Sequence, residues 1–291
     1  MRGNAAEHEL VAPGSLPAVL DLIASSPGKW TPIAGGTELM VAFAAGRLSA
    51  DKLVSLWGLK ELRFINTEPD RIAIGAGTTF ADLRADTTLS SELPLLDRSA
   101  SWIGAIANQA RATIGGNLVN GSPAADSSPA LLVYDAEVEL ISVRGKRRIP
   151  YHQFHTGYKQ NAMTADELML AIHLPRRFSQ HRQYLRKVGT RRAMAISKVA
   201  LGAVARVTDN VVDEIRLAAA SLAPFPTRLY KTETAVAGKA LTAEIIESAR
   251  QALLGEAQPI DDIRSKAEYR RQVGANLLEE FLRSLTTEKS A

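Results

Sequence analysis

The sequence predicts an α+β protein of two domains, with a three-stranded sheet and helices in the second. The chain has 291 residues, which is enough for two domains of ordinary size. Apolar patterns typical of strands and helices are mixed in the first part, whereas in the second part three strands precede the helices. Pro175, Arg176 and Arg177 interrupt the pattern between the two parts.

The first sixty residues are expected to form a small βαβ-like lobe. Apolar residues at helical spacing predict a helix over 15–25, closed by Pro27–Gly28. The apolar run 30–34 predicts a strand that leads directly into Gly35–Gly36. A second helix follows, and then a strand over 52–56.

The segment from 61 to 176 is expected to be a second lobe of helices and strands. The expected strands are 71–76, 137–143, 146–149 and 168–174, and the expected helices are 79–83, 94–110 and 128–134. The strands expected over 137–143 and 146–149 should form a hairpin about Arg144–Gly145. Pro175 ends the last strand, because proline donates no hydrogen bond to a sheet.

The remainder is expected to be a small domain of three antiparallel strands followed by a helical bundle. Its expected strands are 183–188, 197–207 and 211–219, and its expected helices are 232–237, 242–254 and 267–285. The predicted domain limits are therefore 1–176 and 177–291.

Composition narrows the class of protein. Lys and Arg total 35 against 31 Asp and Glu, and this net charge of +4 is too small to predict a nucleic-acid partner. There is no cysteine, which excludes disulfides, thiolate nucleophiles and iron–sulfur clusters held by this chain. No signal peptide and no apolar stretch of membrane-spanning length are visible, so we expect a cytoplasmic protein without a membrane span.

Two segments carry the main functional signal. The first glycine loop (residues 32–39) reads Pro-Ile-Ala-Gly-Gly-Thr-Glu-Leu, and the second glycine loop (residues 112–117) reads Ala-Thr-Ile-Gly-Gly-Asn. Paired glycines let a ligand approach backbone N–H groups, which bind anions at the start of a helix. Two such loops could hold the two phosphates of one dinucleotide, with Asp126 accepting hydrogen bonds from a ribose.

Other interpretations compete with nucleotide binding. Either diglycine, taken alone, is more often a tight turn. A Walker A motif is absent, and Gly75-Ala76-Gly77 matches only part of a Rossmann fingerprint. His152 and His155 have the spacing of metal ligands but no third ligand nearby in the sequence, so we predict no metal site.

The two loops, in this order, resemble those of the FAD-binding medium subunits of molybdenum hydroxylases, which include xanthine dehydrogenase and carbon monoxide dehydrogenase. The likeness continues through five further segments and covers nearly the whole chain. These segments are Ser122–Asp126, Phe154–Tyr158, Asp166–Leu168, Leu185–Arg192 and Ala267–Arg271. The resemblance implies a two-lobed FAD-binding domain of the vanillyl-alcohol-oxidase (PCMH) type, followed by a small C-terminal domain.

The resemblance also implies which residues contact FAD. Both loops would wrap the diphosphate, with the Thr113 hydroxyl and backbone N–H groups of the second loop as donors. Asp126 would bind near the ribose or ribityl, and Ile103 stands where relatives often place an aromatic residue. The implied cofactor-binding set is Ile33, Ala34, Gly35, Gly36, Thr37, Glu38, Leu39, Ile103, Thr113, Ile114, Gly115, Gly116, Asn117, Asp126, Met169 and Lys187.

The implied role is electron transfer, with no catalytic residue on this chain. A large molybdopterin subunit would oxidise the substrate, and a small 2Fe-2S subunit would pass electrons to FAD and on to NAD, a quinone or oxygen. Lys187, Arg191 and Arg192 would stabilise reduced flavin or attract an acidic acceptor. The alternative is a non-catalytic assembly subunit of the same fold that has lost FAD.

Overall fold

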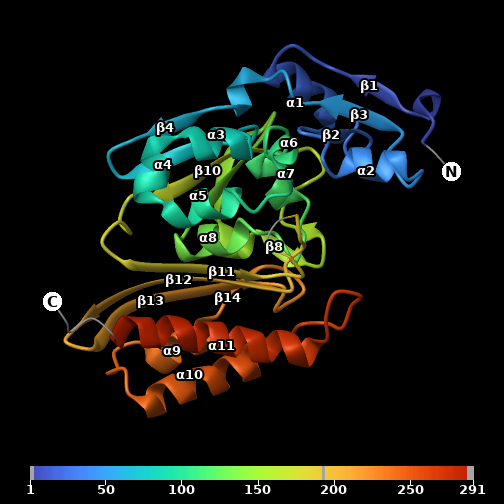
Figure 1. Cartoon of the computed structure of the whole chain (residues 1–291). Helices are drawn as coiled ribbons and strands as arrows, with labels where there is room; N and C mark the ends of the chain where they lie inside the picture. Colours follow the sequence, from blue (N-terminus) through green and yellow to red (C-terminus); the bar gives the residue numbers. More distant parts are fainter. Residues whose placement is uncertain (1–2, 192–193, 287–291) are drawn as a thin grey trace.

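Three bodies are stacked along the molecule in the order of the sequence (Figure 1). The structure, a computed structural model, describes residues 3–191 and 194–286. A small N-terminal lobe lies at one end and a larger second lobe lies in the middle. A sheet backed by helices forms the other end (Figure 1). No helix in the described ranges is both long and apolar enough to cross a lipid bilayer.

The first lobe is a three-stranded parallel sheet with two helices. Its elements are β1 (Glu9–Val11), α1 (Leu16–Ser25), β2 (Thr31–Ile33), α2 (Leu39–Ala44) and β3 (Lys52–Ser55). The strand order is β1-β3-β2, and Ile33 pairs with Ser55 at the carboxyl ends of β2 and β3. The predicted βαβ arrangement is present, and β1 is a strand that the sequence patterns did not indicate.

The second lobe is an antiparallel sheet of five strands with helices on one face. The strand order is β4-β5-β10-β6-β7. Its strands are β4 (Ile65–Thr67), β5 (Arg71–Gly75), β6 (Glu137–Ser142), β7 (Gly145–Pro150) and β10 (Leu168–Pro175), with β8 (His155–Gly157) and β9 (Gln160–Asn161) as a separate hairpin. The predicted hairpin about Arg144–Gly145 is therefore confirmed as the β6–β7 pair.

Six short helices accompany this sheet among the described residues. They are α3 (Phe80–Ala85), α4 (Thr87–Glu92), α5 (Pro94–Ala100), α6 (Ile106–Gln109), α7 (Ile114–Val119) and α8 (Ser128–Val133). Thr79 begins α3 with a capping box closed by Asp82, as its position before the apolar run suggested. The single helix predicted over 94–110 is wrong. Gly104, at φ +51°, lies in the turn that separates α5 from α6.

The C-terminal part is a four-stranded antiparallel sheet in the order β11-β12-β13-β14, backed by three helices. Its elements are β11 (Arg182–Val188), β12 (Val199–Thr208), β13 (Val211–Ala220), β14 (Thr227–Arg228), α9 (Tyr230–Val236), α10 (Ala243–Glu256) and α11 (Ala267–Thr286). Three strands and three helices were predicted. The fourth strand has only two residues, which is too short for a period-two pattern to be read.

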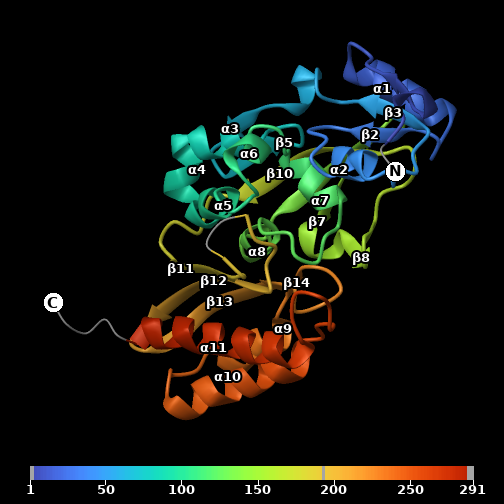
Figure 2. The ribbon, with the colours of Figure 1, turned by 45° about the vertical axis from the view of Figure 1, so that its right-hand side comes forward.

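This sheet lies between the second lobe and the C-terminal helices (Figures 1 and 2). Helix α8 packs on one face and α9 and α11 on the other. Val204 and Ala218 belong to the core of the second lobe, whereas Leu201 and Ala203 belong to the core under the helices. A Cβ on Gly202 would lie 3.1 Å from Pro129, so α8 approaches β12 closely at that glycine.

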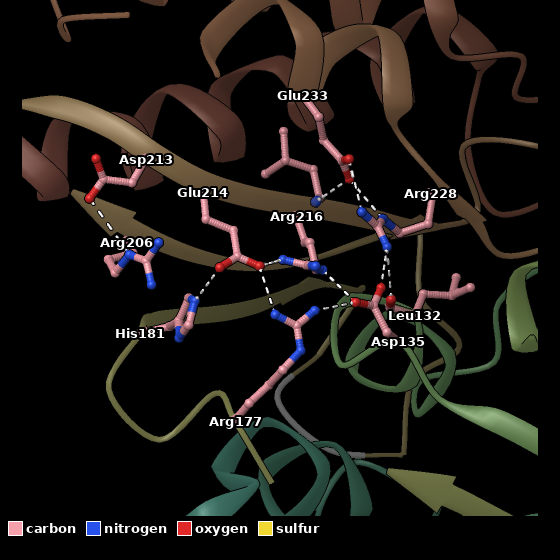
Figure 3. A network of polar contacts seen from close by, with 11 residues as sticks. Leu132, Asp135, Arg177, His181, Arg206, Asp213, Glu214, Arg216, Arg228 and Glu233 are labelled. Carbon is pink, nitrogen blue, oxygen red and sulfur yellow. Dashed lines mark hydrogen bonds and ion pairs between the residues drawn. The ribbon is translucent and has the colours of Figure 1, made fainter. Parts of the chain in front are cut away.

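A network of charged side chains joins the two domains beside α8 (Figure 3). Asp135, just after α8, accepts hydrogen bonds from Arg177, Arg216 and Arg228 at 2.7–2.8 Å. Arg228 also pairs with Glu233 of α9 at 2.7 Å. The docking of the C-terminal domain therefore combines apolar packing with ion pairs that are partly buried.

Candidate functional site

The two glycine loops meet at a cavity of about 380 Å³ between the two lobes, here called the interlobe cleft. This volume lies in the range of small-molecule sites. It is lined by Thr31, Pro32, Ala34, Gly35, Gly36, Thr37, Glu38, Leu39, Leu56, Leu62, Ala76, Gly77, Ile103, Ala112, Thr113, Gly115, Gly116, Asn117, Val119, Asn120, Met163, Leu168 and Met169. Twelve of the sixteen residues assigned from the sequence line this one cleft.

The two loops are in direct backbone contact. A Cβ on Gly35 would lie 1.8 Å from the carbonyl oxygen of Arg111, immediately before the second loop. A Cβ on Gly115 would lie 2.6 Å from the Cβ of Ala76. These two glycines are therefore required by the packing of one segment of the protein on another.

The first glycine loop presents backbone donors. The N–H groups of residues 35–38 donate no hydrogen bond to any residue within 3–191 and 194–286. Gly36 adopts φ +74°, a left-handed conformation that glycine tolerates. The loop leads into α2, whose N-cap is Glu38, so these N–H groups lie just before the first hydrogen-bonded turn of the helix. They are suited to an anionic oxygen.

The second glycine loop has fewer such donors, because among its described N–H groups only that of Thr113 donates no hydrogen bond. The N–H groups of Ile114 and Gly115 donate to the carbonyls of Thr78 and Ala76, and that of Asn117 donates to the carbonyl of Thr113. Thr113 is the N-cap residue of α7, and its hydroxyl accepts a hydrogen bond from the N–H of Gly116 at 3.1 Å. The expectation of free backbone donors does not hold for residues 114–117, because capping and packing of α7 use their N–H groups.

The second loop instead contributes a glycine without a side chain, Gly116, and two polar side chains, the Thr113 hydroxyl and the Asn117 amide. A Cβ on Gly116 would meet the Thr113 hydroxyl oxygen at 2.9 Å and no other heavy atom within 4 Å, so this glycine faces the open cleft. The Thr113 hydroxyl can still donate its hydrogen. The Asn117 carbonyl oxygen accepts from Ser127 at 2.7 Å, which fixes the orientation of the amide.

Asp126 and Lys187 lie together but outside the lining of the cleft. The Lys187 ammonium is 2.6 Å from the Asp126 carboxylate, and the Ser197 hydroxyl donates to the same carboxylate at 2.5 Å. Burial raises the pKa of Asp126, while the ammonium and the hydroxyl act against that rise. The pair joins the second lobe to β11. Neither residue is among those that line the cleft.

The other predicted residues take different positions. Ile103 and Met169 line the cleft. Ile33 ends β2 beside the cleft, and Ile114 is fully buried in the core of the second lobe. Arg191 is exposed and donates to the Met194 carbonyl, and Arg192 lies outside the described residues.

Eleven lining residues lie outside the predicted cofactor-binding set, and two of them, Pro32 and Ala112, belong to the glycine loops. Leu56 could have been found, because it follows β3 just as Ala34 follows β2, and adjacent parallel strands end at one edge of a sheet. Met163 and Asn120 carry no comparable signal. They reach the cleft only through the folding of the second lobe.

The histidine pair has a structural role at one of its two positions. His155 is buried, and its Nε2 lies 3.1 Å from the hydroxyl of Tyr151. Burial lowers the pKa of His155 to about 4, so the ring is neutral near pH 7. Within residues 3–191 and 194–286 no three His, Cys, Asp or Glu side chains gather at a spacing suited to a metal ion.

Comparison with known proteins identifies the family. Residues 6–177 match the model of the FAD-binding domain in molybdopterin dehydrogenase, and residues 184–285 match that of the CO dehydrogenase flavoprotein C-terminal domain. A xanthine dehydrogenase FAD-binding subunit from Escherichia coli O157:H7 is 32% identical over 258 residues, which is 88% of each chain. The nicotinate dehydrogenase FAD-subunit of Eubacterium barkeri is 31% identical over 74% of each chain.

A solved structure agrees with this result. Carbon monoxide dehydrogenase from Hydrogenophaga pseudoflava contains a chain that superposes with a TM-score of 0.91 at 26% identity, covering 96% of each chain. The predicted fold, a two-lobed FAD-binding domain followed by a small C-terminal domain, is confirmed. The chain belongs to the family of FAD-binding medium subunits of the xanthine dehydrogenase and carbon monoxide dehydrogenase type, and its cofactor is FAD.

Proposed function

We propose that this chain is the electron-transfer subunit of a molybdenum hydroxylase and holds FAD in the interlobe cleft. The observation that carries the proposal is the first glycine loop, whose residues 35–38 line the cleft and whose N–H groups have no partner among the described residues. FAD supplies one- and two-electron transfer when it is bound.

Different residues of the chain bind different parts of FAD in this proposal. The first loop donates backbone N–H groups to the diphosphate, and Thr113 donates its hydroxyl from the opposite wall. Gly116 leaves room for close approach. Ile103 and Met169 provide an apolar wall for a flat ring system. Asp126 and Lys187 act from outside the cleft by holding the loop that carries Ser127, which orients Asn117.

The partners in this proposal are a large molybdopterin-binding subunit and a small 2Fe-2S subunit, in a heterotrimer or its dimer. Electrons enter from the small subunit and leave to NAD, a quinone or oxygen. The names of relatives as FAD-binding subunits and medium chains support a multi-subunit complex. The lack of cysteine agrees with clusters on other chains and with a cytoplasmic location.

The domain limits are also part of the proposal. We assign residues 1–176 to the FAD-binding domain, with its lobes meeting near residue 60, and residues 177–291 to the C-terminal domain. Strand β10 ends at Pro175 and β11 begins at Arg182, so no strand crosses the proposed limit.

The experiment is to isolate the tagged chain from its native cells and to measure flavin, molybdenum and iron in the purified material. We expect one FAD and one molybdenum per chain and an iron content set by the small subunit, all eluting together on gel filtration. Recovery with FAD but without molybdenum or iron, under conditions that preserve complexes, would contradict the role in a molybdenum hydroxylase.

A further inference from the structure

The interlobe cleft lacks a positive charge for the anion it is built to hold. Of the described residues that line it, Glu38 alone has an ionisable side chain. The diphosphate of FAD carries about two negative charges at neutral pH. Placing it beside a carboxylate is unfavourable unless a cation lies nearby. The source of that cation should lie just outside the lining residues.

Lys159 occupies such a position. Its ammonium lies 3.7 Å from the Glu38 carboxylate. The two residues belong to different lobes, because Glu38 precedes α2 of the first lobe and Lys159 lies in the turn between β8 and β9 of the second. The pair therefore joins the two lobes at the cleft.

The backbone around Lys159 is fixed against the helix that follows the second glycine loop. Lys159 adopts φ +53° at the tip of its hairpin. Its Cα would lie 3.1 Å from a Cβ on Gly121, just after α7. The Asn161 amide donates to the carbonyl of Val119, in the last turn of the same helix, at 3.4 Å. The backbone of the lysine is thus held close to the end of α7, while its side chain is about half exposed.

The present partner of Lys159 is easily exchanged. The side chains of Lys159 and Glu38 are 47% and 63% exposed. Ion pairs of that exposure contribute little to stability, so a second anion can replace the carboxylate at small cost. A phosphate oxygen at the first loop would compete directly with Glu38 for the ammonium.

Two other cations near the loops are already engaged. The Arg111 guanidinium stacks 3.7 Å from the ring of Trp57, and its Nε donates to the Gly35 carbonyl at 3.4 Å. The Lys187 ammonium is paired with the buried Asp126. Either cation would have to break a contact of the protein to reach a ligand in the cleft.

We propose that Lys159 is the counter-charge for the FAD diphosphate, and that binding moves its ammonium from Glu38 to a phosphate oxygen. The proposal rests on the proposed function, because it requires FAD in the interlobe cleft. It adds a binding residue from outside both glycine loops. It also predicts that the Glu38–Lys159 pair is present without cofactor and absent with it.

The test is a fluorescence titration of FAD into the full chain after removal of bound flavin. Lys159→Gln should raise the dissociation constant about tenfold or more and should reduce its dependence on salt. Lys159→Arg should restore most of the affinity. The control is Lys52→Gln, which breaks the exposed Lys52–Glu9 pair of 2.7 Å in the first lobe without touching the cleft.

The titration distinguishes failure of FAD binding by the chain from failure of the proposed role of Lys159. If the wild-type chain does not bind FAD, the proposed function fails. If the wild type binds FAD and Lys159→Gln matches Lys52→Gln in both affinity and salt dependence, the role of Lys159 is overturned. Circular dichroism melts of both variants should coincide with the wild type, because each lysine is about half exposed and its ion pair contributes little to stability.

Discussion

The two glycine loops look alike in sequence and differ in what they offer a ligand. Both place a diglycine before a short helix and line the same cleft. In the first loop the N–H groups of residues 35–38 have no partner among the described residues. In the second, the N–H groups of residues 114–117 all donate to carbonyls or to the Thr113 hydroxyl.

A diglycine therefore does not by itself define an anion site. In the first loop, Gly35 allows the loops to touch, and Gly36 adopts a left-handed conformation next to N–H groups that donate no hydrogen bond among the described residues. In the second, Gly115 lets α7 pack on Ala76, and Gly116 leaves open space in the cleft. One loop donates hydrogen bonds, and the other provides space.

The contact between the loops should be the most sensitive point. Gly35→Ala places a Cβ 1.8 Å from the Arg111 carbonyl oxygen, and backbone on both sides must move. We expect a loss of about 3 kcal/mol or more in unfolding free energy, together with loss of FAD. Urea denaturation and flavin content measure the two effects. Gly58→Ala, which meets no atom within 4 Å, is the control, and equal stability of the two variants would refute the contact.

The next largest loss of unfolding free energy should come from breaking the Asp126–Lys187 pair, which joins the second lobe to the C-terminal domain. Asp126→Ala leaves the Lys187 ammonium buried without its carboxylate. Removing one partner of a buried ion pair costs about 3 kcal/mol of unfolding free energy. Glu9→Ala, which breaks an exposed pair with Lys52, should cost less than about 1 kcal/mol. If urea denaturation gives similar values for both variants, Asp126 does not hold the domains together.

Gly116→Val should separate cofactor binding from stability. The new side chain enters the cleft and displaces only the Thr113 hydroxyl, so we expect unfolding free energy to fall by about 1 kcal/mol. FAD should no longer remain bound through gel filtration, because the side chain occupies the space for close approach. A folded variant with unchanged flavin content would show that the second loop does not contact the cofactor.

Substitution of Thr113 should give the smallest change in unfolding free energy, and it should distinguish helix capping from a hydrogen bond to FAD. Thr113→Val removes the N-cap of α7, which costs about 1 kcal/mol, whereas Thr113→Ser keeps the hydroxyl. If the hydroxyl also donates to FAD, the valine variant should lose affinity and the serine variant should keep it. Thermal unfolding and FAD titration provide the two measurements. Equal affinity in both variants would restrict Thr113 to capping.

Much of the fold followed from local patterns. The helix at Leu16–Ser25, the hairpin about Arg144–Gly145 and the ten-residue strands β12 and β13 have clear apolar periods. The break in the stretch 94–110 did not, because Gly104 is a single glycine in an otherwise helical composition. Short strands such as β14 owe their existence to a neighbouring strand and leave no local trace.

The site was predictable only where a local sequence pattern marks it. Gly35 and Gly116 stand out because paired glycines are visible in the sequence. The use of the N–H groups of the second loop was not visible, since it depends on the carbonyls of Ala76 and Thr78 from a distant turn. Lys159 was missed because its charge reaches Glu38 only when the two lobes come together.

The most direct test of this account is equilibrium titration of FAD into the full chain after removal of flavin, with the bound chromophore identified by chromatography. We expect saturation at one FAD per chain, and a Gly116→Val variant that remains folded and colourless. A folded wild-type chain that takes up no FAD would contradict the account. The chain would then be an assembly subunit that keeps the two loops without their cofactor.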